Sequence, residues 1–212
     1  MGRRKKEPES VHRENIAQAA EHLFFEKGVD NTTMDDVARE AGYSKATLYV
    51  YFANKGELIH FLVLKSMKLL KESLAKAVTG QGTIRDKYDR ICEALVFYQE
   101  QYPFYFSLVL GKIDVEFKGR TPLPVETETV ETGEQINRIL ASFIQEGIAS
   151  GEFRPGLPVL ETVFLFWSSL SGLIRMADSK QAYIEQAMGI TKQQFLTFGF
   201  EQLYRMAGGE ES

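Results

Sequence analysis

The sequence contains very little cysteine, and this limits the chemistry that it can carry. Cys92 is the one cysteine among 212 residues, so the chain cannot form an internal disulfide. Proteins of oxidising compartments usually carry paired cysteines, and this composition therefore favours a reducing, intracellular environment. A lone thiol also has no partner with which to build a structural zinc site.

Histidine is also scarce and is unevenly placed. The three histidines are His12, His22 and His60, and residues 61–212 contain none. This excludes a histidine-based catalytic triad and a histidine metal site from the larger part of the chain. The sequence also lacks a G-x-S-x-G elbow, a phosphate-binding glycine loop and a dinucleotide fingerprint. We therefore expect no enzyme, no metal site and no cofactor, although a pair of catalytic carboxylates would leave no such signature.

Long apolar runs, proline and excess charge are sparse as well. The longest apolar run, between Glu161 and Arg175, includes three serines and falls short of the roughly 20 residues that a membrane span needs. The basic N-terminus leads into a polar segment without a signal-peptide core. Only six prolines interrupt the chain, and its net charge is −4, so any basic surface for nucleic acid must be small. These features predict a cytoplasmic, globular protein.

Apolar residues recur at helical spacing in almost every part of the chain. Residues 12–27 show the pattern clearly, with Ile16, Ala20 and Leu23 on one stripe and Gly28 at its end. No alternating strand pattern is present, so the predicted fold class is all-α. We expect residues 121–133, which combine prolines with alternating Thr and Glu, to form an irregular connection. The further predicted helices cover residues 33–41, 45–52, 55 onwards, 84–98, 136–150, 158–176 and 192–206.

Residues 33–52, TMDDVAREAGYSKATLYVYF, predict two short helices that cross steeply. Thr33 and Ser44 supply N-cap hydroxyls, and Gly42 permits the positive φ of a tight turn. The second helix is too short to be stable alone, so it must pack on its neighbours. The residues spaced to form that small core are Val37, Ala41, Tyr43, Leu48 and Tyr51. This arrangement predicts a helix-turn-helix that binds DNA, in an N-terminal domain of three helices.

The outward face of the second helix carries side chains suited to the major groove. Lys45 can donate to guanine or to a phosphate, and Thr47 can contact a base edge or a thymine methyl group. Tyr49 offers a hydroxyl to a phosphate. Thr33 and Lys55 begin helices whose backbone N–H groups also face an anion.

Residues 12–60 resemble the DNA-binding domain of the TetR family of bacterial regulators. The matching stretches are Ile16-xx-Ala19-Ala20-xx-Leu23-Phe24-xxx-Gly28, Thr32-Thr33-xx-Asp36-Val37-Ala38-xx-Ala41-Gly42 and Ser44-Lys45-x-Thr47-Leu48-Tyr49-x-Tyr51-Phe52-x-Asn54-Lys55-xx-Leu58. The resemblance implies a homodimer on a palindromic, double-stranded DNA operator, released by a small-molecule effector. Val50 departs from the pattern, since many relatives carry an aromatic residue there. The candidate DNA-contacting residues are Thr33, Ser44, Lys45, Thr47, Tyr49, Tyr51 and Lys55.

The remainder of the chain has to pair the DNA-binding units and control them. We predict that residues 1–58 form an N-terminal arm and the DNA-binding domain, and that residues 59–212 form a helical domain for ligand sensing and dimerisation. The helix over 162–174 is apolar on every side, and Ser168 and Gly172 would let a second helix approach. A symmetric four-helix interface is expected, with a well-filled monomer core as the alternative. The basic arm, Arg3-Arg4-Lys5-Lys6, either reaches a flanking minor groove or stays solvated.

Aromatic side chains are dense in the middle helices. Some are expected to fill core and others to line an apolar cavity for a flat or greasy ligand. The candidate ligand-binding residues are Tyr98, Tyr102, Phe106, Phe143 and Phe166. Such a ligand would shift the helix that begins at Lys55 and change the spacing of the two recognition helices, so that ligand and DNA weaken each other. The other class to consider is a helical interaction module, in which changing Lys45 or Tyr49 would leave function intact.

Overall fold

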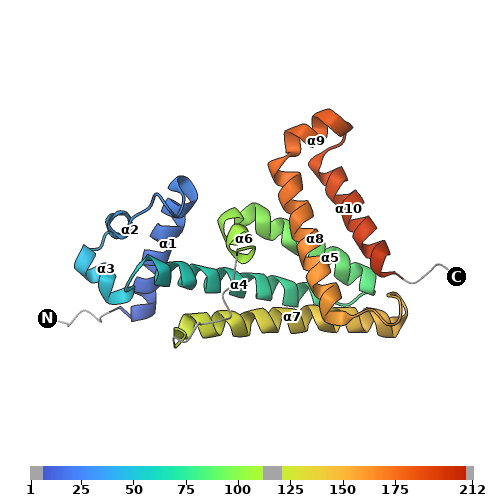
Figure 1. Cartoon of the computed structure of the whole chain (residues 1–212), viewed down its shortest axis with the longest axis horizontal. Helices are drawn as coiled ribbons and strands as arrows, with labels where there is room; N and C mark the ends of the chain where they lie inside the picture. Colours follow the sequence, from blue (N-terminus) through green and yellow to red (C-terminus); the bar gives the residue numbers. More distant parts are fainter. Residues whose placement is uncertain (1–6, 112–120, 209–212) are drawn as a thin grey trace.

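The computed structural model describes residues 7–111 and 121–208, which form ten α-helices and one isolated antiparallel bridge between Phe153 and Gly208 (Figure 1). The all-α prediction is confirmed. The basic arm at residues 3–6 lies outside the described residues. The helices are α1 Glu9–Lys27, α2 Met34–Glu40, α3 Lys45–Tyr51, α4 Lys55–Thr79, α5 Ile84–Gln101, α6 Pro103–Val109, α7 Pro124–Ser150, α8 Val159–Ser179, α9 Gln181–Met188 and α10 Lys192–Ala207.

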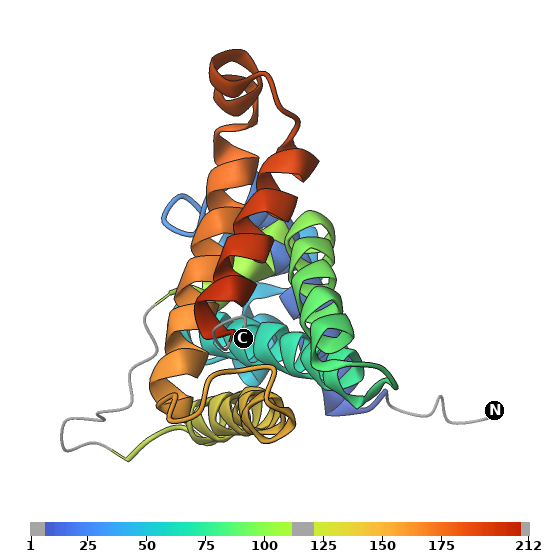
Figure 2. The same cartoon turned by 90° about the vertical axis from the view of Figure 1, so that its right-hand side faces the viewer.

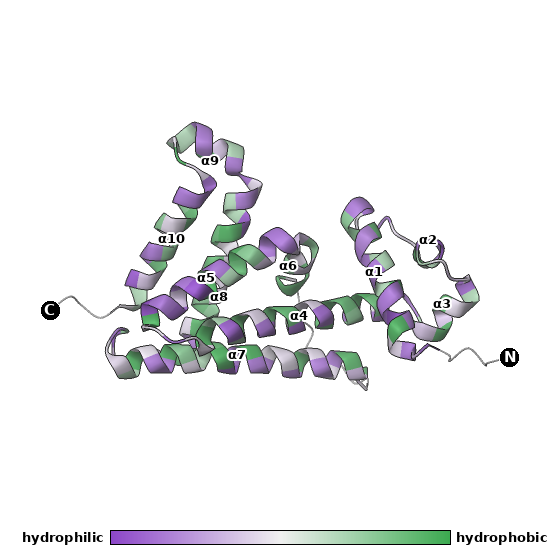
Figure 3. Cartoon of the chain, turned by 180° about the vertical axis from the view of Figure 1, so that it is seen from behind, coloured by the Kyte–Doolittle hydropathy of each residue, from purple (hydrophilic) through white to green (hydrophobic). Residues whose placement is uncertain are grey.

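Helix α4 connects the two ends of the molecule. Helices α1, α2 and α3 gather around its N-terminal end, and α7 runs alongside it (Figure 1). Seen from behind, α4 and α7 show alternating apolar and polar bands, as expected for helices that bury one face (Figure 3). The domain boundary that we predicted at residue 58 falls in the first turn of α4. A movement of α4 would therefore reach both parts of the chain.

Capping side chains mark the starts of five of the ten described helices, α2, α3, α4, α5 and α10. The Asn54 carboxamide oxygen accepts from the Glu57 N–H at 3.0 Å and caps α4. Thr83 and Asp86 form a reciprocal capping box at the start of α5, and hydrogen bonds from Thr83 hold the pKa of Asp86 below its usual range. These caps are local in sequence, which is why the predicted starts of the capped helices agree with the structure, whereas α6 and α9 were not predicted and α1 and α7 begin earlier than expected.

One expected loop is helical. Helix α7 begins at Pro124, so the prediction of an irregular connection over 121–133 was wrong beyond residue 123. Proline at a first helical position lacks an N–H that would be unpaired anyway, and it therefore marks a start rather than a break. The hydroxyls of Thr129 and Thr132 each donate at 2.7 Å to the carbonyl four residues earlier, which lets both side chains be buried inside α7.

Helix α8 is the most apolar of the described helices that have eight or more residues. By length and composition alone, its 21 residues could cross a membrane. The expectation that the apolar segment is too short for a membrane span is therefore wrong for the whole helix. Core helices of soluble proteins pass the same test. Here α8 packs against α5, α7 and α10.

Helices α8 and α10 extend side by side from the rest of the fold, and α9 joins their far ends (Figure 2). They approach closely because Gly199 of α10 lies against Leu173 of α8, where a Cβ would come within 2.3 Å. On the outside the pair exposes large apolar side chains. We call this surface the α8–α10 face, defined by Leu165, Ser168, Gly172, Met176, Phe198, Gln202 and Met206.

Gly147 is required by packing near the end of α7. A Cβ at this position would come 2.2 Å from the fully buried Phe153 ring. We expect Gly147→Ala to lower the free energy of unfolding by about 1–3 kcal/mol, measured by urea unfolding. Gly133→Ala in the same helix is the matched control, because its Cβ would meet only the flexible end of Met67 at 3.3 Å. Alanine is about 1 kcal/mol better than glycine inside a helix, so equal losses in both variants would contradict this explanation.

Candidate DNA interface and effector pocket

The helix-turn-helix is assembled from local caps and a small shared core. Thr33 caps α2 by accepting from the Asp36 N–H at 3.2 Å, and the Thr33 N–H donates back to the Asp36 carboxylate at 3.0 Å. Hydrogen bonds from Thr33 lower the pKa of Asp36. Gly42 has a φ of 72° in the turn. The predicted core residues meet as expected: Val37 and Leu48 are fully buried, and Ala41, Tyr43 and Tyr51 pack against them.

The structure leaves one face of α3 open to solvent. Lys45 and Tyr49 are exposed, with Tyr49 43% exposed, and Val50 is 77% exposed. Ser44 accepts from the Thr47 N–H at 3.1 Å, and the two hydroxyls lie 2.7 Å apart, so both are held at the N-terminus of α3. These side chains form a continuous surface along the length of the helix. A groove that admits an α-helix would meet this surface first.

Lys45 already has a partner within the chain. Its ammonium donates to the Asp35 carboxylate at 2.9 Å, and this hydrogen bond raises the pKa of Lys45 above its ordinary value. The amine therefore remains charged at any physiological pH. Because the pair is exposed, a phosphate or a guanine could take the place of Asp35.

Tyr51 and Lys55 have different surroundings from the rest of the predicted set. The ring of Tyr51 is half-buried and stacks on His12 with centroids 5.1 Å apart. The Lys55 ammonium donates to the carbonyls of Val29 and Thr32 at 2.9 and 3.1 Å, so two of its three N–H bonds hold the loop between α1 and α2. Only the third remains for a phosphate.

Two residues of α1 position the recognition helix and were not predicted. The Arg13 guanidinium donates to the Tyr51 carbonyl at 2.5 Å and to Glu57 at 3.2 Å, and it lies 4.2 Å from the Phe52 ring centroid. His12 Nδ1 lies 2.8 Å from the Tyr43 hydroxyl. These contacts join residues 31 to 44 positions apart, so no local pattern could have revealed them.

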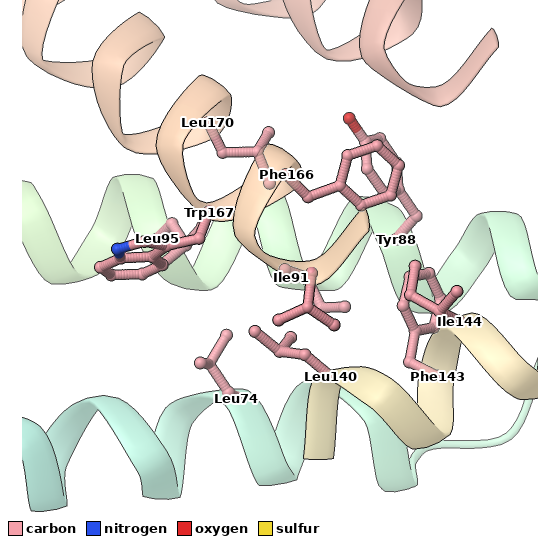
Figure 4. A pocket seen from close by; sticks show the side chains of 11 residues that line it. Leu74, Tyr88, Ile91, Leu95, Leu140, Phe143, Ile144, Phe166, Trp167 and Leu170 are labelled. Carbon is pink, nitrogen blue, oxygen red and sulfur yellow. The ribbon is translucent and has the colours of Figure 1, made fainter. Parts of the chain in front are cut away.

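A small apolar cavity lies between α4, α5, α7 and α8. Figure 4 shows its lining side chains, with the ring of Phe166 of α8 beside Tyr88 of α5 at a centroid distance of 5.9 Å and Phe143 contributed by α7. Its free volume is about 20 Å³, room for about one water molecule. The lining residues are Leu74, Tyr88, Ile91, Leu95, Leu140, Phe143, Ile144, Val163, Phe166, Trp167 and Leu170.

A larger pocket lies next to this cavity, where α4, α6, α7 and α8 meet. It has a free volume of about 270 Å³, and it shares Leu140, Val163 and Trp167 with the inner cavity. These three side chains therefore border both spaces. Its other lining residues are Met67, Leu70, Val109, Thr129, Val130, Gly133, Glu134, Ile136, Asn137 and Phe164.

The five predicted ligand-binding aromatics fall into two groups. Phe143 and Phe166 line the inner cavity. Tyr98, Tyr102 and Phe106 form a separate cluster, in which the Tyr98 ring lies 5.9 Å from Tyr102 and 6.3 Å from Phe106, and none of the three lines either pocket. Tyr98 is buried and donates to the Ser66 carbonyl at 2.8 Å. The side chains of this second group pack together where α5 meets α6.

Three outer-pocket residues of α7, namely Thr129, Val130 and Gly133, were missed because their segment had been expected to be irregular. Thr129, Gly133, Ile136 and Leu140 follow one another at helical spacing. Applying that period through residues 121–133 would have found this stripe. Nothing in the sequence indicates that Met67 and Trp167 face the same space.

Helix α6 connects the outer pocket with the DNA-binding unit. Val109 lines the pocket, and the Tyr105 hydroxyl donates to the Glu21 carboxylate of α1 at 2.5 Å. Burial raises the pKa of Tyr105 well above its usual value, so it keeps this proton. Phe104 adds a ring contact with Phe24 of α1 at 6.1 Å.

Comparison with known proteins identifies the N-terminal unit. Residues 16–61 match the model of bacterial regulatory proteins of the tetR family. The chain is 28% identical over 151 residues to the fatty acid metabolism regulator protein of Bacillus subtilis, covering 68% of this chain and 72% of that one. It is 40% identical over 84 residues to the HTH-type transcriptional regulator TtgR of Pseudomonas putida, which covers 40% of each chain.

The likeness extends to the whole fold. The crystal structure of the transcriptional regulator FadR from Bacillus subtilis in complex with stearoyl-CoA superposes with a TM-score of 0.67 at 18% identity, covering 90% of this chain and 97% of that one. The helix-turn-helix, the family match and the shared helical architecture agree with one another. The chain belongs to the tetR family of bacterial regulatory proteins, and it is a helix-turn-helix transcriptional regulator rather than an enzyme.

Proposed function

We propose that this chain acts as a homodimeric repressor that leaves a palindromic operator when an apolar effector enters the pocket between α4, α6, α7 and α8. In this proposal residues 1–58 bind DNA and residues 59–212 sense the effector and dimerise. Repression is the simpler mode, because occluding a promoter needs no additional contact surface. The observation that carries the proposal is the pair of connections, through α4 and through α6, between the pocket and the unit that presents α3.

The DNA contacts follow from the exposed surface of α3. Lys45, Thr47 and Tyr49 are proposed to read or orient the major groove, with Ser44 and Thr33 at helix N-termini near phosphates. Tyr51 and Lys55 are proposed to contact the DNA backbone only through their exposed atoms. Most of each side chain already makes contacts within the protein. In a dimer the two recognition helices would lie about 34 Å apart in successive major grooves.

The effector is proposed to be largely apolar. The inner cavity is lined by apolar and aromatic side chains, and the outer pocket adds only Thr129, Glu134 and Asn137 as polar groups among its described lining. A structural neighbour is in complex with stearoyl-CoA, and the long apolar chain of that ligand, though not its anionic CoA group, is consistent with an apolar effector body. Filling the pocket would displace Val109 and thereby α6, whose Tyr105 holds α1. Effector and operator would then weaken each other's binding by the same factor.

Footprinting tests this proposal directly. The purified protein is incubated with DNA from upstream of its own gene, and then with selected genomic fragments. We expect a protected palindrome whose half-sites are about one DNA turn apart. Deleting the gene should raise transcription from the protected promoter, whereas a fall would indicate an activator. If a folded dimer protected no fragment at any salt concentration, the interaction-module alternative would replace this proposal.

A further inference from the structure

The polar end of the outer pocket is acidic. Glu134 is the one charged residue among its described lining residues, and neither lysine nor arginine nor histidine contributes to that lining. Within the part of the chain that the structure describes, Glu134 has no ion-pair partner, whereas Glu128, earlier in the same helix, pairs with Lys68. A carboxylate at the mouth of an apolar pocket attracts a cation and repels an anion.

The remaining polar lining does not reverse this preference. Thr129 already donates its hydroxyl to the Val125 carbonyl, which leaves its oxygen as an acceptor. Asn137, three residues after Glu134, can accept or donate. Acceptors therefore predominate, and they suit the N–H donors of an ammonium or amidinium group.

The apolar part of the pocket begins about one and a half turns further along α7. Leu140 lies about 9 Å from Glu134 along the helix axis, and it borders both the outer pocket and the inner cavity. Trp167 and Phe164 of α8 supply aromatic faces, which also attract cations. The space thus combines one exposed carboxylate, two aromatic side chains and an apolar region that continues toward the inner cavity.

We infer that the effector site takes an amphipathic cation, with its positive head at Glu134 and its apolar body directed past Leu140 and Trp167. This inference deepens the proposed function and rests on it for the consequence that binding releases DNA. The site would discriminate against carboxylates and acyl phosphates of the same apolar body, because no described lining residue neutralises their charge.

The chain contains a built-in reporter for the test. Trp167 is the one tryptophan in the sequence, and it borders both spaces. The purified full-length protein is titrated with 6-phenylhexylamine, 6-phenylhexan-1-ol and 6-phenylhexanoate, which share one apolar body, while Trp167 fluorescence is recorded. We expect the amine to bind at least about tenfold tighter than the carboxylate, with the alcohol between them. The preference should decrease as salt is added.

Two variants on α7 locate the charge. Glu134→Gln should weaken amine binding about fivefold and leave alcohol binding unchanged. Glu131→Gln removes an exposed carboxylate that does not line the pocket, and it should change neither. Any of three results would overturn the inference. The carboxylate could bind as tightly as the amine or tighter, the preference for the amine could persist in Glu134→Gln, or Trp167 fluorescence could respond to none of the probes.

The titration is independent of DNA, so its failure can be told apart from failure of the proposed function. If the protein binds an operator and other compounds release it, but the amine is not preferred, only the inferred class of ligand is wrong. A clear cation preference in a protein that protects no DNA would remove only the regulator proposal.

Discussion

Replacing Lys45 with alanine is expected to weaken operator binding by at least roughly thirtyfold, because each of the two half-sites loses a contact worth about 1 kcal/mol or more. Lys45 is exposed and contributes nothing to the core, so the fold should be unaffected. The slope of log affinity against log salt should also become shallower, since each lysine that contacts a phosphate releases about one counterion. Fluorescence anisotropy with the footprinted operator at several salt concentrations measures both effects.

Two companion variants make this prediction specific. Lys76→Ala removes a lysine near the opposite end of α4 and should leave operator affinity unchanged. Asp35→Asn removes the carboxylate that now holds the Lys45 ammonium and should strengthen operator binding several-fold, because the amine no longer has to exchange one anion for another. If Lys45→Ala bound as tightly as the unaltered protein, the proposed orientation of α3 in the groove would be wrong.

Replacing Phe198 with glutamate is expected to dissociate the proposed homodimer. Phe198 is 63% exposed in the single chain and lies on the α8–α10 face, where a symmetric partner would bury it. A charge buried without a partner disfavours association strongly, and central aromatic residues contribute most of the binding energy of interfaces. Sedimentation should show the unaltered protein at twice the chain mass of 24.1 kDa and the variant at the chain mass. Operator affinity should fall by at least about a hundredfold, because each monomer reaches one half-site.

Phe97→Glu is the matched control for this prediction. Phe97 is 59% exposed, but it shares a surface hollow with Ser73 and Lys76 of α4 and does not belong to the α8–α10 face. This variant should remain dimeric and bind DNA normally. Thermal unfolding followed by circular dichroism shows whether either variant loses its fold. A dimeric Phe198→Glu together with a monomeric Phe97→Glu would place the interface elsewhere.

The sequence alone determined the local structure of this protein. Thr33, Ser44 and Asn54 form caps with residues three positions away, and Gly42 allows the positive φ that the turn needs. Such interactions depend only on near neighbours, so they can be read in order along the chain. The helix-turn-helix and the starts of the capped helices were predicted for this reason. The error at residues 121–133 arose because prolines were taken as breaks although Pro124 stands at a first helical position.

The tertiary structure alone decided which side chains line the pocket. Tyr98 and Phe143 are both buried aromatics at helical spacing, yet Tyr98 fills a joint between helices and Phe143 borders a cavity. The pocket is the volume that four helices leave unfilled, and that volume depends on how side chains from residue 67 to residue 167 pack together. A burial pattern records only that a side chain faces inward. Whether it meets another side chain or an empty space is set by distant parts of the chain, as are the contacts that hold Lys55 and Arg13.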